Sequence, residues 1–91
     1  MSRILSKGQH ISTIVRDRTG IIFEGLVGSL TSFNEEGEFD VLPLHSNFIS
    51  IIQNQLTLRQ KGEVVKSIEF QTGILTVRDD AAEVFLGILS R

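Results

Sequence analysis

Apolar residues in this chain occur in short runs rich in Ile, Val, Leu, Phe and Thr, and no long helical periodicity is present. Gly, Asn or Asp interrupts the runs about every 6–12 residues, which is typical of an all-β sandwich or barrel. Within residues 10–16 the alternation places Ile11, Thr13 and Val15 on one face. Residues 55–60 alternate in the same way, with Leu56 and Leu58 directed inward.

These runs predict about nine or ten short strands, separated by turn residues. The expected strands cover residues 10–16, 21–23, 26–33, 40–42, 48–52, 55–60, 63–70, 74–78 and 82–89. Breaks are expected at 24–25, 34–37, 53–54 and 72–73, and tight hairpin turns at 61–62 and 79–80. Because parallel neighbours need connections of a dozen residues or more, we expect mostly antiparallel pairing. The prediction is a two-layer antiparallel β-sandwich that forms a single domain over residues 1–91.

The composition excludes several kinds of function. The chain has 91 residues, a net charge of −2 and no Trp or Tyr, so it offers neither a cationic field nor the stacking platform for nucleic acid. It has no cysteine, which removes disulfides, thiolate zinc sites and thiol nucleophiles. Its apolar runs are far shorter than the roughly 20 residues that span a bilayer. We therefore expect a soluble domain that meets a membrane only through a partner.

The possible chemical sites are weak. Glu35, Glu36, Glu38 and Asp40 form an acidic cluster, but their spacing does not match a calcium loop. His45 has no companion from which a catalytic triad or a carboxylate pair could be built. No glycine pattern forms a phosphate cradle. The residues alone predict no catalytic group, metal or cofactor, and indicate a β-sandwich that binds a protein.

The last strand leaves two interpretations open. Residues 85–89 read F-L-G-I-L, unusually apolar for a terminal strand. They form either a core strand or a strand whose outer face is covered by a second domain or a partner.

Two segments carry a family resemblance. Residues 20–25 read G-I-I-F-E-G, and residues 35–45 read E-E-G-E-F-D-V-L-P-L-H. Together with L-T-L-R at 56–59 and G-I-L-T-V at 73–77, they occur in the order and spacing of one family. From about residue 10 to 84 the chain resembles the N-terminal β-sandwich domain of the epsilon subunit of F-type ATP synthases.

The resemblance implies a non-catalytic rotor subunit of the central stalk, which couples ion flow to ATP synthesis or hydrolysis. It would dock on the gamma subunit and the membrane c-ring, on the cytoplasmic inner face of the cell membrane. Whether the ion is a proton or sodium stays open. Carried over by position, Glu36 and Glu38 face the c-ring. The positions implied to face gamma are Asp17, Leu42, His45 and Ser50.

The chain also departs from the family pattern. Residues 45–48 read H-S-N-F where the family has H-A-P-L, so the proline of this turn is missing. Typical members continue into a two-helix C-terminal domain that inhibits hydrolysis or binds ATP, whereas this sequence ends at Arg91. We expect a short form that binds no ATP. The competing hypothesis is a stand-alone β-sandwich interaction module that shares only the fold.

Overall fold

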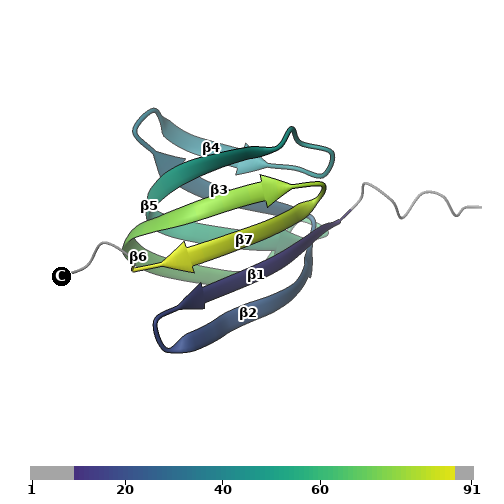
Figure 1. Cartoon of the computed structure of the whole chain (residues 1–91). Helices are drawn as coiled ribbons and strands as arrows, with labels where there is room; N and C mark the ends of the chain where they lie inside the picture. Colours follow the sequence, from purple (N-terminus) through teal and green to yellow (C-terminus); the bar gives the residue numbers. More distant parts are fainter. Residues whose placement is uncertain (1–9, 88–91) are drawn as a thin grey trace, which may run out of the picture.

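The computed structural model describes residues 10–87, and all regular structure in that range is β-strand. The strands join in one hydrogen-bonded sheet with the order β2-β1-β7-β6-β5-β3-β4 (Figure 1). Their bounds are β1 Ile11–Asp17, β2 Gly20–Val27, β3 Ser29–Asn34, β4 Gly37–Val41, β5 Phe48–Gln60, β6 Glu63–Arg78 and β7 Ala81–Leu86. The all-β prediction is confirmed, but the described residues form seven strands rather than nine or ten.

Two long strands explain the lower count. β5 has 13 residues and β6 has 16, and each runs through a position where a break was expected. At the first position a register shift between Gln53 and Asn54 absorbs the extra residue, with Asn54 at φ 77°. Such a bulge bends a strand and leaves the ladder on either side intact. The β5–β6 ribbon therefore bends and continues, so the single sheet folds over on itself into the two layers of a sandwich (Figure 1).

Other expected boundaries move by a few residues. β2 runs through Glu24 and Gly25, and the chain leaves it at Gly28, whose amide donates to the carbonyl of Arg59 at 2.7 Å. The strand expected at 40–42 begins earlier, at Gly37, because it pairs with β3 from Leu30 to Asn34. The last strand ends at Leu86, and the expected extension to 88–89 lies outside the described residues.

The pairing is antiparallel throughout the described sheet except between β1 and β7. These first and last strands run parallel, from the pair Ser12–Ala81 to the pair Arg16–Phe85. More than a dozen residues separate them along the chain, which satisfies the requirement for a parallel connection.

The core lies between the two layers. Its side chains alternate along the strands, as the hydrophobic pattern predicts: Ile11, Thr13 and Val15 are buried on β1, and Leu56 and Leu58 on β5. The remaining buried apolar residues come from both halves of the folded sheet: Val27, Leu30, Val41, Ile52, Leu75, Val77, Ala82, Val84 and Leu86.

Gly73 is placed in β6 by close packing and not by turn geometry. A Cβ atom at this position would lie 2.8 Å from the carbonyl oxygen of Phe85 and 2.9 Å from a methyl group of Leu86. The backbones of β6 and β7 approach each other here in a way that only glycine permits. The residue that predicts a strand break in the sequence is therefore required inside a continuous strand.

We expect Gly73→Ala to lower the free energy of unfolding by about 1–3 kcal/mol, since the added methyl must displace backbone of β7. Gly25→Ala is the matched control, because a Cβ there would touch only the ring of Phe23, at 3.4 Å. Urea denaturation of both variants measures the difference. Equal stability of the two variants would contradict this packing argument.

Candidate partner-binding surfaces

Most of the residues singled out from the sequence lie in segments at two opposite ends of the sandwich (Figure 1), and Ser50 lies on β5 between them. We call the end formed by the turns at 17–20 and 34–37 the turn end, and the end formed by residues 42–47 and 79–80 the loop end. The strand register supports this division, since Arg16 pairs with Phe85 toward the turn end and Ser12 pairs with Ala81 toward the loop end.

The turn end is acidic. Glu35 and Glu36 form the two-residue connection between β3 and β4, and the side-chain oxygen of Asn34 accepts a hydrogen bond from the Glu36 amide at 2.8 Å. Glu38 follows on β4, opposite Phe33, and is exposed. None of these three carboxylates forms an ion pair within residues 10–87. They are available to a cationic partner.

Asp17 also lies at the turn end, where it closes the β1–β2 turn. One of its carboxylate oxygens accepts hydrogen bonds from the Thr19 hydroxyl at 2.7 Å and the Thr19 amide at 2.8 Å. These bonds hold the pKa of the Asp17 carboxyl below its ordinary value of 3.8, since they favour the charged form. The structure therefore places Asp17 with Glu36, and away from Leu42 and His45.

The loop end is held by Asp80. Its carboxylate accepts a hydrogen bond from the Leu44 amide at 2.7 Å, and its carbonyl accepts one from the Ser12 amide at 2.9 Å. Asp79 and Asp80 both have positive φ, at 52° and 61°, which matches the tight turn between β6 and β7. A single residue thus joins the start of β1, the β6–β7 turn and the 42–47 loop.

Apolar and aromatic groups gather on this loop. Leu42 and Leu44 are 55% and 76% exposed. The His45 ring lies 4.9 Å from the ring of Phe48, whose other contact is an edge-to-face packing on Phe39 at 6.3 Å. The His45 ring therefore packs on Phe48 although it is exposed.

Ser50 lies along the strand that leaves the loop end. It pairs with Leu75 of β6, and its hydroxyl donates to the carbonyl of Ile51 at 3.2 Å. Leu42, His45 and Ser50 therefore belong to one side of the molecule, formed by the loop and the first part of β5. Asp17 does not join them.

The sequence interpretation missed an apolar surface on the outer face of the sheet. The strand register aligns Ile51, Ile74, Phe85, Arg16 and Ile21 in one row across five strands. Ile51, Phe85 and Ile21 are 61%, 40% and 57% exposed. Alternation within each strand gives part of this signal, but only the register shows that the residues form a row. The interpretation of the last strand as one with a partly exposed apolar face agrees with the position of Phe85.

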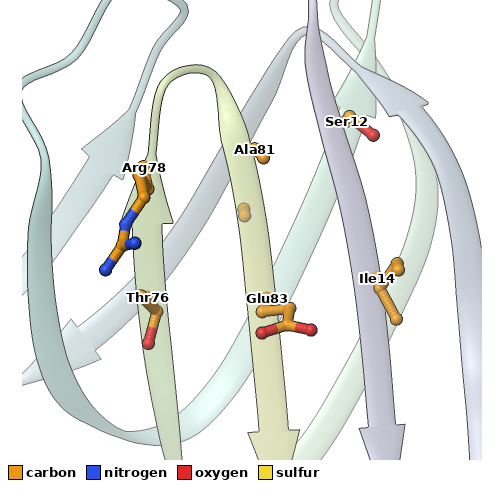
Figure 2. A pocket seen from close by; sticks show the side chains of 7 residues that line it. Ser12, Ile14, Thr76, Arg78, Ala81 and Glu83 are labelled. Carbon is orange, nitrogen blue, oxygen red and sulfur yellow. The ribbon is translucent and has the colours of Figure 1, made fainter.

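An open hollow adjoins this row. Figure 2 shows it between Ser12 and Ile14 of β1 and Thr76 and Arg78 of β6, with Ala81 and Glu83 of β7 in the middle. The small side chain of Ala81 leaves the space. Glu83 lies 3.6 Å from Arg16 in an exposed ion pair, which contributes little to stability.

The hollow has few groups that could hold a ligand. Within the described part of the chain, no three His, Cys, Asp or Glu side chains gather as a metal site would require.

Within residues 10–87, no helix has the length and apolar character to cross a membrane. These features define an all-β sandwich domain with an acidic end, an apolar loop and a partly apolar outer face.

The chain belongs to the family of the β-sandwich domain of the ATP synthase delta/epsilon chain, whose model matches residues 10–87. This match covers the whole described range and confirms the resemblance seen in the sequence. No curated protein is similar enough in sequence to count as a match.

Two solved structures share the fold. One is a chain of the Euglena gracilis mitochondrial ATP synthase, described as OSCP/F1/c-ring, with a TM-score of 0.74 and 19% identity. The match covers 86% of this chain and 51% of that one. The other is a chain of the central stalk/c-ring of the Tetrahymena thermophila mitochondrial ATP synthase, with a TM-score of 0.71 and 15% identity, over 88% of this chain and 65% of that one. The present chain therefore aligns with only part of each relative.

The Asp17 turn generates a pH-dependent prediction. Because its pKa is lowered in the folded state, the contribution of Asp17 to stability is present above its unfolded pKa and is lost as the pH falls through the folded value. We expect Thr19→Val to raise this pKa toward the ordinary value, and Thr19→Ser, which keeps the hydroxyl, to leave it low. Titration of the side-chain carboxyl by NMR measures both, and an identical pKa in the two variants would contradict the assignment.

Proposed function

We propose that this chain is a non-catalytic rotor subunit of the central stalk of an F-type ATP synthase, which docks on the gamma subunit and the c-ring. The observation that carries the proposal is the family match over residues 10–87. The fold shared with central-stalk and c-ring structures supports it. In this role the domain passes torque between partners and performs no chemistry of its own.

The turn end suits the c-ring. Glu36 and Glu38 are exposed, carry no ion pair among the described residues and project from a short hairpin. Such carboxylates can meet basic side chains and backbone amides of the loops that connect membrane helices. With the c-ring at this end, the domain lies at the inner face of the cell membrane without entering it.

The loop end and the first part of β5 suit the gamma subunit. Leu42 and Leu44 supply exposed apolar area, and the His45 ring packs against Phe48. Ser50, on the first part of β5, lies on the same side of the molecule. We include Asp17 among the gamma contacts only if gamma extends along the full length of the sandwich, because Asp17 lies at the opposite end from His45.

The proposal is tested by a tagged pull-down from solubilised native membranes that contain intact synthase. Recovery of the alpha, beta, gamma and c subunits together with the tagged chain supports the rotor role. Recovery of none of them from such a preparation would overturn it and favour a stand-alone interaction module.

We expect Glu38→Lys to lower the recovery of c subunits by about tenfold or more, because it replaces attraction with repulsion at a rim contact. Glu63→Lys is the control, since Glu63 is also exposed but begins β6 next to the distant 61–62 turn. Thermal unfolding should show both variants folded. If the two variants retain c subunits equally well, Glu38 has no role at the c-ring.

A further inference from the structure

The first part of β5 has an open edge. Residues 48–52 pair with β6 on one side, from Phe48–Val77 to Ile52–Gly73. On the other side no strand within residues 10–87 pairs with them, since the pairing of β5 with β3 begins at Gln53. Figure 1 shows this part of β5 and the edge strand β4 along the same side of the molecule. One row of β5 backbone groups is therefore without a ladder partner.

This edge lacks the charged residues and the proline that usually protect an open strand. Residues 48–52 read F-I-S-I-I, with no charge and no proline, and Ile49 and Ile51 are 68% and 61% exposed. Soluble proteins normally guard such edges with Lys, Pro or a bulge, because an unguarded β-branched edge recruits another strand. An edge of this composition is suited to being covered by another strand.

The surroundings of the edge define the chemistry of its partner. A hollow beside it is lined by Ile49, Ser50 and Ile51 from β5 and by Glu35 and Glu36 from the β3–β4 turn. These carboxylates have no cationic partner among the described residues. A strand added here would present apolar side chains to Ile49 and Ile51 and a Lys or Arg to Glu35, which leaves Glu36 and Glu38 to the c-ring.

We propose that an extended, basic strand of the gamma subunit adds to β5 at residues 48–52 and continues the sheet. This inference rests on the proposed function, because it takes gamma as the partner. A second copy of the chain fits less well: its own edge, residues 47–53, contains no Lys or Arg to meet Glu35. The expected interface combines main-chain hydrogen bonds with charge pairing at its turn-end side.

Amide hydrogen exchange by NMR, on the full chain alone and in complex with purified gamma subunit, tests strand addition directly. Amides that point to the open edge should exchange rapidly in the free chain. In the complex, alternate amides of residues 48–52 should become protected, because only every second residue of a strand faces a given neighbour. Docking through side chains alone does not produce this alternating pattern.

A matched pair of variants tests the same edge by affinity. Ile51→Lys places a cation on the edge, where it blocks strand addition and repels a basic segment. Ile21 lies in the same row at the opposite edge of the sheet and is similarly exposed, so Ile21→Lys is the control. We expect Ile51→Lys to weaken gamma binding by at least about tenfold and Ile21→Lys by less than about twofold. Unchanged thermal unfolding shows that both variants are folded.

The outcomes separate the two proposals. Gamma binding without protection at residues 48–52, or equal weakening by both lysines, overturns strand addition and leaves the rotor role intact. Self-association of the free chain that protects the same amides and is lost in Ile51→Lys overturns gamma as the occupant. Failure of the wild-type chain to bind gamma at all overturns the rotor role, and strand addition with it.

Discussion

The bend in the β5–β6 ribbon is the constraint on which the sandwich depends. The ribbon is a single ladder that belongs to both layers, so the core can close only if the ladder turns without losing its hydrogen bonds. The ladder turns at the bulge opposite Gln53 and Asn54, where Gln71 of β6 is the extra residue and Asn54 of β5 has φ 77°. Gly73 supplies the space in β6, where the carbonyl of Phe85 would lie 2.8 Å from any Cβ. A straight ribbon would leave Leu75 and Leu58 in the same plane and the core open.

Much of this architecture could be predicted from the sequence. Strict alternation identified the buried face of β1 and of the second half of β5, because a half-buried strand repeats every two residues. The Lys61-Gly62 turn was also predictable, since Gly62 suits its φ of 79°, although Lys61 has a positive φ of 53° as well. The continuity of the long strands was not predictable. A glycine such as Gly73 has the same local appearance whether it ends a strand or allows two backbones to approach, and only the distant residue Phe85 decides between the two.

The candidate surfaces show the same limit. The acidic turn was visible as a run of letters, but the position of Asp17 relative to His45 depends on the topology, which places the β1–β2 turn at one end of the strands and residues 42–47 at the other. The open edge at residues 48–52 could not be predicted from the sequence either, because it depends on which other strands pair with β5. A strand in the interior of a sheet and a strand at its edge can have the same hydrophobic pattern, so exposure of Ile49 and Ile51 follows from topology.

The parallel pairing of β1 with β7 has a mechanical consequence. β1 begins at the loop end and β7 finishes at the turn end, so Ile11 and Leu86 lie at opposite ends of two neighbouring strands. Tension applied between these two points runs along the strands and loads their hydrogen bonds in shear, all at once, instead of opening them one by one like a zip. A force directed along these strands must therefore break the whole row of hydrogen bonds together before β1 can separate from β7.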